Sequence, residues 1–277
     1  MANSPSIYKD RVLAWNTYCN GTKLDSSYEL ISVSIRLELN HIGKATLKFN
    51  AGNMDKQTFD ETDSDFFKPG NTIRFDAGDL NSQATLFEGI IMQSGIRIGK
   101  GFRSQMVVEC RDNAFPATQG RRNRIFEKKK DCDMIQEVLS AYGSVKVDDT
   151  GYEHPEMVQY YATDWDFALS RADACGLFAF TSGADLSFFK PKVSAAPVLT
   201  VTYGVDLISF DGGLSGGDQY TTYEGVSWNP AEQNIVKVAA SAPALNKQGD
   251  LQPDVIAAGD SLLIQTDAPT EDGALKE

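Results

Sequence analysis

Histidine and cysteine are scarce in this chain, and that scarcity excludes much of the usual catalytic and metal chemistry. Only His41 and His154 supply an imidazole among 277 residues, so the commonest general base and metal ligand is nearly absent. The four cysteines are Cys19, Cys110, Cys132 and Cys175. They form no C-x-x-C pair and lack the spacing of a zinc ribbon. We therefore expect free thiols in a reducing compartment, no metal site and no cofactor.

Long apolar runs and positive charge are also lacking. No run approaches the roughly 18 apolar residues of a membrane-spanning helix, and the first ten residues lack the apolar core of a signal peptide. The chain has 26 Lys and Arg against 38 Asp and Glu, a formal net charge of −12 that repels phosphate backbones and anionic membranes. These features predict a soluble protein with no membrane-spanning segment and no nucleic-acid partner.

What remains is the composition of an ordinary folded protein. Hydrophobic residues make up 42% of the chain and charged residues 23%, with 10 Pro and 23 Gly, which is typical of globular domains. The length suits two domains of roughly 100 to 200 residues each.

The first part of the chain has the two-residue period of half-buried strands. Apolar and polar residues alternate from Ser26 to Phe49, apart from a short break at 40–43 that contains Gly43. The apolar positions are Ile31, Val33, Ile35, Leu37 and Leu39 before the break, and Ala45, Leu47 and Phe49 after it. The break predicts an antiparallel hairpin with His41 in its turn.

Further strands are expected before residue 111. Lys68-Pro69-Gly70 predicts a tight turn, and strand-like runs follow at 72–75, 84–98 and 106–110. About six strands in some 110 residues describe a small barrel or sandwich. We therefore assign residues 1–110 to a first β-barrel domain.

Two helices are expected after Arg111, because the apolar spacing becomes helical. Asp133 is expected to cap the first helix, which ends at Gly143, and Gln136 completes a capping box. The apolar positions of this helix are Met134, Ile135, Val138, Leu139 and Tyr142. The second helix is expected to begin at Thr163 and to end at Gly176. Its apolar positions are Trp165, Ala168, Leu169, Ala172 and Cys175.

A β-hairpin is expected after the second helix, because apolar runs at 177–181 and 186–189 flank a turn at 182–185. Residues 111–200 are therefore an inserted α+β domain. The chain then returns to short strands at 199–202, 207–210, 221–228 and 234–240. The segment 211–218 has four glycines in eight residues and predicts a mobile loop. We assign 201–277 to the start of a second barrel that the chain leaves incomplete, with a capped helix beginning at Thr270.

Several short segments match a known catalytic or binding motif but lack the other residues that such a site needs. Residues 213–217 read G-x-S-x-G around Ser215, but no histidine follows the serine, so a flexible loop is the better interpretation. The S-x-x-K letters at 6–9 lack every companion motif. The acidic residues Asp60, Glu61, Asp63 and Asp65 depart from a calcium loop and are read as a solvated connector. His154 is expected to be exposed in a polar loop.

A basic run from Arg121 to Lys130 is the one stretch that could grip phosphate. In a chain with a net charge of −12, pairing with acidic surface is the favoured interpretation. That surface could belong to this chain or to another subunit.

The segment 157–169 reads MVQYYATDWDFAL and leads to GLFAF at 176–180. It resembles the signature of the VgrG and phage tail-hub family, which includes late-control protein D-like proteins, with Thr163 where that family usually has Ser. Three other segments resemble the family in order and spacing: FKPG at 67–70 with LFEGI at 86–90, GRRNRIF at 120–126, and VSWNP at 226–230. The signature positions carried over to this chain are Pro69, Gly70, Phe87, Gly89, Arg121, Arg122, Gln159, Tyr160, Asp164, Trp165, Phe167, Gly176 and Trp228.

The resemblance implies the structural hub of a contractile injection machine, either a type VI secretion spike or a phage-like tail. It implies a mainly β chain with two tandem β-barrel tube domains and an inserted α+β unit. Three such chains form a ring that adapts a hexameric tube to a trimeric spike. The implied partners are two further copies in a homotrimer, an Hcp-like tube ring, a spike domain or tip, baseplate proteins and effector cargo. The implied location is the cytoplasm on synthesis, then the machine that leaves the cell on firing, or a virion tail.

Two other classes of function remain open at this point. A tail-associated cell-wall hydrolase needs paired carboxylates in a cleft, and Glu88, Glu109, Asp164 and Asp166 are available. A carbohydrate-binding module could stack sugars on Trp15, Trp165 and Trp228, although Trp165 on a helix face is expected to be core. We favour the structural protein without enzymatic activity, since each catalytic motif fails in its context.

Overall fold

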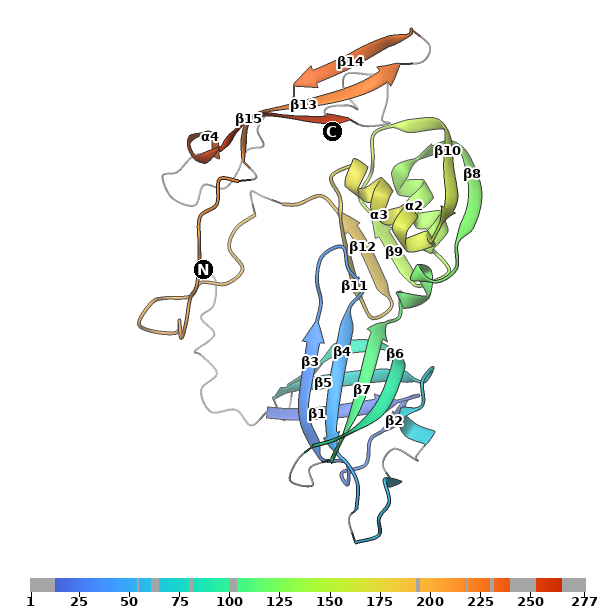
Figure 1. Ribbon diagram of the computed structural model, residues 1–277, viewed down its shortest axis with the longest axis vertical. Coiled ribbons are helices and arrows are strands. Elements are labelled where there is room, and N and C mark those ends of the chain that lie inside the picture. Colours follow the sequence, from blue (N-terminus) through green and yellow to red (C-terminus); the bar gives the residue numbers. More distant parts are fainter. Residues whose placement is uncertain are drawn as a thin grey trace.

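The computed structural model describes residues 13–53, 55–60, 65–79, 82–99, 104–192, 195–217, 219–229, 232–239 and 253–265. The fold is mainly β, as the sequence predicts, and Figure 1 shows it as an elongated molecule. A large sheet lies at one end, an α+β unit lies in the middle and a small sheet lies at the other end.

The large sheet has seven strands in the order β2-β1-β5-β6-β7-β4-β3. Its elements are β1 (Leu13–Cys19), β2 (Thr22–Lys23), β3 (Leu30–Arg36), β4 (Lys44–Asn50), the short 3-10 helix η2 (Asp65–Phe67), β5 (Thr72–Asp79), β6 (Ser82–Ile98) and β7 (Ser104–Asp112). All of its strand pairs are antiparallel. The predicted runs at 72–75, 84–98 and 106–110 are confirmed as parts of β5, β6 and β7.

Strand β6 bends the sheet over on itself, because its first half pairs with β5 and its second half with β7. In Figure 1, β1 runs across the direction of β3, β4 and β7. The end strands β2 and β3 do not pair with each other, so the described strands form an open, bent sheet and no closed barrel. The closed barrel expected from the sequence is therefore not present in this part of the chain.

The core of the bent sheet lies between its two crossing halves, where the two-residue period points one face of each strand inward. Its fully buried side chains are Leu47, Phe49, Ile73, Ile91, Met106 and Val108. Phe66 and Phe67 of the turn before β5 pack with Tyr28 and Phe49, with ring centroids 5.0 to 6.3 Å apart.

The hairpin of β3 and β4 is confirmed, but the register places some apolar residues outside. A register shift between Leu30 and Ser32 turns Ile31 outward, so that Ile31 is 43% exposed. Leu37 and Leu39 belong to the loop and are also exposed. The expected single apolar face of this strand is therefore wrong at these three positions, because a β-bulge breaks the alternation at Ile31 and the strand ends at Arg36, before Leu37 and Leu39.

The middle unit packs two helices on short sheets. Its elements are η3 (Phe115–Thr118), β8 (Arg122–Lys130), α2 (Asp131–Leu139), β9 (Ser144–Val147), β10 (Glu153–Ala162), α3 (Asp164–Ala174), β11 (Phe178–Ser182) and β12 (Asp185–Phe189). β8 pairs with β10, and β9, β12 and β11 form a second sheet. The predicted hairpin of β11 and β12 is confirmed, with Gly183 at a φ of 63° in its turn.

Helix α3 begins and ends where the sequence predicts. The Thr163 hydroxyl accepts a hydrogen bond from the Asp166 amide at 3.0 Å, which caps the first turn. Gly176 has a φ of 64°, the left-handed conformation that ends many helices. Its apolar face joins α2 in one core, in which Trp165, Ala168 and Leu139 are buried.

Helix α2 begins two residues before the predicted cap. Asp133 is exposed in the first turn and caps nothing, because the helix starts at Asp131. The amide of Cys132 donates instead to the hydroxyl of Thr150, 3.0 Å away on the loop between β9 and β10. A side chain distant in sequence therefore replaces the local cap that the sequence predicts.

The third unit is a small sheet of β13 (Tyr220–Asn229), β14 (Asn234–Ala239) and β15 (Gly259–Gln265), with the short helix α4 (Pro253–Ile256) beside it. The strands predicted at 221–228 and 234–240 are confirmed as β13 and β14. The strands predicted at 199–202 and 207–210 are wrong, because the described chain there has only isolated bridge positions, at Leu199 and between Tyr203 and Leu207. No helix in the described ranges is long and apolar enough to cross a membrane.

Candidate functional site

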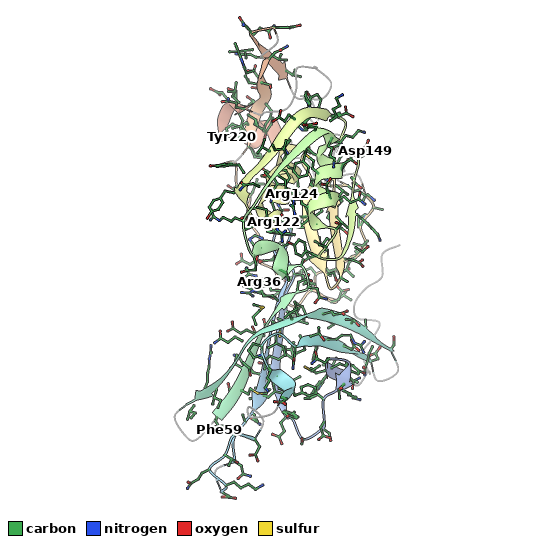
Figure 2. All side chains as sticks on the ribbon, turned by 90° about the vertical axis from the view of Figure 1, so that its right-hand side faces the viewer. Arg36, Phe59, Arg122, Arg124, Asp149 and Tyr220 are labelled. Atoms are coloured by element: carbon green, nitrogen blue, oxygen red, sulfur yellow. The ribbon has the colours of Figure 1, made fainter. Side chains whose placement is uncertain are left out.

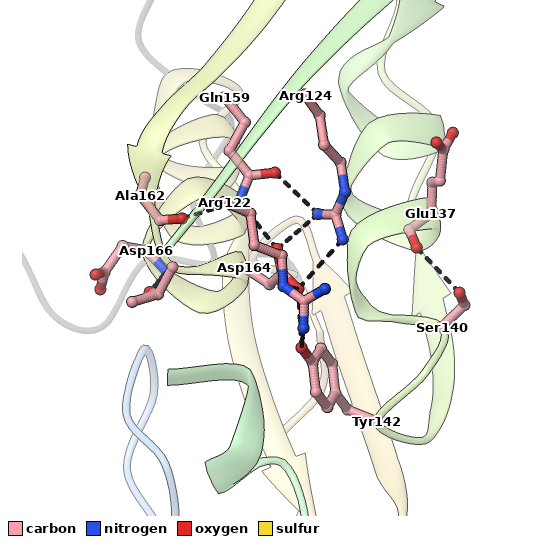
Figure 3. Close-up of polar contacts among 10 residues, drawn as sticks. Arg122, Arg124, Glu137, Ser140, Tyr142, Gln159, Ala162, Asp164 and Asp166 are labelled. Atoms are coloured by element: carbon pink, nitrogen blue, oxygen red, sulfur yellow. Dashed lines mark hydrogen bonds and ion pairs between the residues drawn. The ribbon is translucent and has the colours of Figure 1, made fainter. Parts of the chain in front are cut away.

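A polar cluster in the middle unit gathers three of the signature residues. We call it the signature cluster and define it as Arg122, Arg124, Tyr142, Gln159 and Asp164 (Figure 3). Strand β8 supplies the two arginines, β10 supplies Gln159, and the first residue of α3 supplies Asp164. Sequence reasoning missed Arg124 and Tyr142; the alternation of Arg122, Arg124 and Phe126 is a signal that could have placed Arg124 beside Gln159.

Asp164 is the centre of this cluster, and its side chain is only 2% exposed. Arg124 Nη1 donates to Asp164 Oδ1 at 2.6 Å, and Tyr142 Oη donates to Oδ2 at 2.8 Å. Gln159 Nε2 donates to Oδ1 at 2.9 Å, while Gln159 Oε1 accepts from Arg124 at 2.9 Å. Arg122 Nε completes the set, 3.1 Å from Oδ2. Figure 3 shows these contacts converging on one carboxylate.

The contacts keep Asp164 ionised. Burial alone would raise the pKa of its carboxyl, but hydrogen bonds from Gln159, Arg124 and Tyr142 outweigh burial and hold the pKa below its ordinary value. Burial and the Asp164 charge raise the pKa of the Tyr142 hydroxyl. A general acid needs a raised carboxyl pKa. The cluster therefore suits holding β8, β10 and α3 together and does not suit acid catalysis.

Other signature residues shape the backbone or fill the two cores. Trp165, Phe167 and Phe87 are buried. Gly70 has a φ of 94° in the predicted turn after Pro69, and its amide donates to the Ile91 carbonyl at 2.8 Å. These positions have structural roles in the fold.

Gly89 lies where β6 passes close to β7. A β-carbon at this position would lie 2.1 Å from the Arg111 carbonyl oxygen. Any side chain here would force the strands apart at the bend of β6.

Three signature residues point to solvent. Tyr160 is 83% exposed and Trp228 is 56% exposed. Arg121 stacks over the ring of Tyr161, with 5.0 Å from Cζ to the ring centroid. Exposed aromatic and arginine side chains of this kind are typical of protein interfaces.

A second buried cluster joins Asp131, His154, Arg171 and Cys175. His154 Nε2 lies 2.8 Å from Asp131 Oδ2, and Arg171 Nε lies 2.5 Å from Oδ1. His154 is only 4% exposed, so the expectation of an exposed histidine is wrong. His154 lies on strand β10, which the sequence pattern does not predict. This strand places the imidazole next to the Asp131 carboxylate at the start of α2.

This second cluster has no reactive nucleophile. Burial, together with the charge of Asp131 and its acceptance of the thiol hydrogen at 3.3 Å, raises the pKa of the Cys175 thiol to about 12. Burial would raise the pKa of Asp131, but its bonds to His154 and Arg171 lower it below the ordinary value. A protonated thiol beside an ionised carboxylate is a stable structural contact and not a catalytic pair.

The large sheet and the middle unit are joined by short polar contacts. Asp112 Oδ2 accepts from the Gly183 amide at 2.9 Å, and Asp112 Oδ1 accepts from the Ala114 amide at 3.0 Å. The Asn40 amide donates to the Ala179 carbonyl at 2.7 Å, and Asn40 Oδ1 accepts from the Ala179 amide at 2.8 Å. We call these contacts the joint; they run from the β3–β4 loop and the end of β7 to the β11–β12 hairpin.

The basic run lies on β8 and pairs with acidic residues of its own chain. Lys129 contacts Glu137, and Lys130 Nζ lies 3.0 Å from Asp149 Oδ1. Figure 2 shows Arg122, Arg124 and Asp149 together in the middle unit. Pairing with acidic surface is therefore confirmed for these residues within one chain.

The remaining motifs of the sequence do not form a common site among the described residues. Ser215 and its glycines lie in an exposed, irregular segment, and the Ser215 hydroxyl accepts only from the Gly217 amide at 3.3 Å. No group of His, Cys, Asp or Glu within the described ranges could hold a metal ion. Asp65 pairs with Lys68 at 2.5 Å. Ser6, Lys9, Glu61, Asp63 and Thr270 lie outside the described residues.

The carboxylates and tryptophans of the two alternative functions do not assemble either. Asp164 is enclosed by its cluster, whereas Asp166 is exposed in the first turn of α3. Trp15 on β1 stacks on Phe75 with ring centroids 6.3 Å apart, Trp165 is core, and Trp228 lies on the small sheet. Three tryptophans in three separate units form no sugar-binding platform.

The fold is similar to that of tail proteins of phages and prophages. A 43 kDa tail protein of prophage MuSo2 from Shewanella oneidensis matches 96% of this chain and 76% of its own, with a TM-score of 0.65 and 13% identity. A tail protein from Neisseria meningitidis matches 95% of this chain and 73% of its own, with a TM-score of 0.62 and 10% identity.

A third structure comes from E. coli and matches 65% of this chain and 50% of its own, with a TM-score of 0.50 and 12% identity. It is described as a component of the type VI secretion system with structural similarity to the T4 tail proteins gp27 and gp5. No curated protein matches the chain by sequence.

The fold predicted from the signature is thus that of phage tail proteins, at the level of the whole chain. These fold similarities are to tail proteins in general and not to VgrG in particular. The sequence model of one family, the Alg8 N-terminal domain, matches residues 9–277. The chain belongs to the Alg8 N-terminal domain family.

Proposed function

We propose that this protein is a structural hub subunit of a contractile injection machine, either a phage-like tail or a type VI secretion spike. In this proposal three copies form a ring that adapts a hexameric tube to a trimeric spike. The observation that carries the proposal is the similarity in fold to two tail proteins over 95 to 96% of this chain. The partners are a tube ring of the Hcp type, a spike domain or tip, baseplate proteins and cargo effectors.

The division into units supports a hub. We propose that residues 1–110 and 201–277 belong to two tube domains and that 111–200 are inserted between them. The first tube domain contributes the bent sheet, whose edge strands β2 and β3 each have one side without a partner strand within the described chain. Open edges invite pairing with another chain. The neighbours in the assembly would close the wall of the tube, which this chain leaves open.

Exposed apolar side chains also support assembly. Large apolar residues with more than half of their surface exposed occur in every unit, for example Leu13 at 75%, Ile125 at 66% and Trp228 at 56%. Obligate interfaces bury more than about 2,000 Å² and are rich in apolar area. A monomeric protein has no reason to expose so many such side chains.

The proposal includes no enzymatic activity. The two buried polar clusters satisfy their own groups, and the Ser215 loop is far in sequence from either histidine. Location follows from the proposed role: the subunit is made in the cytoplasm and becomes part of a tail, which is a virion component or is delivered out of the cell on firing.

Deletion of the gene in the producing cell tests this function. We expect cells that lack the protein to yield no complete tails in electron micrographs, and expression of the chain in trans should restore them. The purified protein should also release no soluble fragments from cell-wall sacculi. Complete tails in the deletion strain would contradict the hub proposal, and efficient sacculus cleavage would support the hydrolase alternative.

A further inference from the structure

The segment Val198–Phe210, which we call the arm, has a strand-like sequence but forms no strand among the residues that the structure describes. Leu199, Val201 and Tyr203 alternate with threonine and glycine, which is the two-residue period of a half-buried strand. Among the described residues the arm nevertheless has only isolated bridge positions, at Leu199, Tyr203 and Leu207, and no continuous strand. Local sequence preference and structure therefore disagree here, and such a disagreement marks a functional site more often than a neutral one.

The exposed surface of the arm is large and apolar. Ile208 is 99% exposed, Val198 95%, Tyr203 89% and Phe210 81%. Figure 1 shows the chain between β12 and β13 running outside the sheets. A contiguous run of such side chains on a soluble protein marks a surface that another molecule covers.

The arm is folded back by a compact turn. The amides of Val205, Asp206 and Leu207 donate to the Thr202 carbonyl at 3.1 to 3.2 Å. Gly204 has a φ of 82°, which this turn requires. The two apolar halves on either side of the turn are therefore presented together, and less conformational entropy is lost when both bind the same surface.

The small sheet of the same chain has an apolar face that is uncovered. Trp228 on β13 lies directly opposite Ile235 on β14, so their side chains share one face of the sheet. Leu263 on β15 lies on that face too, because its partner Glu224 is four residues from Trp228. These three side chains are 56 to 59% exposed. Val238 is the only hydrophobic residue of this sheet that is buried among the described residues.

We propose that the arm of one copy packs on the Trp228–Ile235–Leu263 face of the small sheet in a neighbouring copy. Both surfaces belong to one chain but do not cover each other within it, so a second copy satisfies both at once. The charges also agree: Asp206 is the only charged residue of the arm, and Lys237 lies on the recipient face two residues from Ile235.

This contact is heterologous, because different surfaces of the two copies meet. Contacts of this kind close into rings when the rotation between copies allows it. The inference thus rests on the proposed homotrimer and adds the surfaces by which its copies bind.

One charge at the tip of the arm tests the contact. Ile208→Asp should not unfold the chain, since the side chain is 99% exposed, but it should raise the dissociation constant for self-association by at least about tenfold. Ser209→Asp is the matched control, because it adds the same charge one residue away and removes no apolar side chain from the arm. Sedimentation equilibrium of the full chain measures both variants.

Mixing two variants tests which surfaces meet. Ile235→Asp damages the recipient face and leaves the arm intact, whereas Ile208→Asp leaves the face intact. Each variant alone should sediment as a monomer, while their mixture should form a dimer with one functional contact. Amide hydrogen exchange should show that residues 199–202 and 207–210 become protected in the unmodified assembly and in the mixture.

The outcomes separate this inference from the hub proposal. If the unmodified chain associates and Ile208→Asp associates equally well, the arm is not the contact, although the hub proposal survives. A mixture that stays monomeric would also overturn the pairing of arm with face. An unmodified chain that never associates overturns the inference by itself, because the hub proposal is judged by tail assembly in the deletion strain.

Discussion

Individual polar side chains fasten the elements of the middle unit to one another. Asp164 receives hydrogen bonds from β8, β10 and Tyr142 in the turn after α2, and Asp131 receives them from β10 and α3. A buried carboxylate is tolerated only when such donors replace its water. The two aspartates therefore specify how the strands and helices dock, and neither is available for chemistry.

We expect Asp164→Ala to destabilise the protein strongly. The substitution leaves Arg124 and Gln159 without their acceptor in a buried site, and breaking a buried pair in this way costs about 3 to 5 kcal/mol. Asp166→Ala is the matched control, because Asp166 is exposed in the same turn of α3, and its cost should be about 0.5 kcal/mol or less. Urea denaturation of both variants measures the difference. Equal stabilities would show that the cluster is not coupled to folding.

Asp112 predicts a pH dependence at the joint. Burial raises the pKa of its carboxyl to about 6, although the Ala114 and Gly183 amides oppose the shift. Because the folded pKa lies above the unfolded value, the native state binds the proton more tightly. The contribution of this group is therefore most favourable at low pH, is lost as the pH rises from about 4 to about 6, and is constant above that.

Asp112→Asn should remove this pH-dependent loss, because the amide does not titrate, although its single oxygen can accept from only one of the two backbone amides that Oδ1 and Oδ2 now serve. Relative to the unmodified protein, the variant should gain about 1 to 2 kcal/mol between pH 4 and pH 7, once solvent screening of the charge is allowed for. Unfolding free energies across this pH range test the prediction. A difference that is independent of pH would contradict a buried, titrating Asp112.

Elements of the fold are bent and terminated by contacts that lie far away in the sequence. Strand β6 serves two halves of one sheet because it bends near Gly89, and α2 starts early because Thr150 supplies its cap. In both cases the local pattern predicts the type of element correctly, but the neighbours decide its shape or its limits.

Gly89→Ala should therefore be costly. Its new β-carbon would meet the Arg111 carbonyl oxygen at 2.1 Å, and forcing strands apart in this way costs about 1 to 3 kcal/mol. Gly95→Ala in the same strand is the control, since no atom lies within 4 Å of its β-carbon and its effect should stay within about 0.5 kcal/mol. Thermal melting of the two variants measures the difference in stability. A Gly89→Ala protein as stable as the control would show that β6 can relax at its bend.

At the scale of the whole molecule, the units share little core and expose much apolar surface. The bent sheet and the middle unit each have a buried core, whereas Val238 is the only buried hydrophobic residue among the described residues of the small sheet. Such an architecture suits a subunit whose neighbours complete it. In the hub role proposed above, function depends on the geometry of an assembly, so single reactive groups should not matter to it.

Replacing Ser215 or His41 by Ala should accordingly leave tail function within a few-fold of the unmodified protein. Both residues are exposed and outside the two clusters. The measurement is the number of complete tails and their injection activity after complementation of the deletion strain. Loss of several orders of magnitude, with tails still assembled, would reveal a catalytic role. His154→Ala is not an equivalent test, because that side chain is buried against Asp131 and its loss would destabilise the middle unit.

The sequence by itself determined the β-rich class, the β3–β4 hairpin, helix α3 with both of its ends, and the burial of Trp165. These features depend on residues close together in the chain, so periodicity and capping are sufficient to predict them. The signature letters also pointed to Gln159, Asp164 and Arg122, although not to the carboxylate at which they meet.

Tertiary structure alone decided the features that depend on residues far apart. It replaced the expected cap at Asp133 with Thr150, buried His154 on Asp131, and turned Ile31 outward at a bulge. It also left the bent sheet unclosed and gave the arm only isolated bridges, because a strand needs a continuous edge to pair with and the described residues bring none to Val198–Phe210. Local pattern sets what a segment prefers, and only the available neighbours decide whether that preference is met.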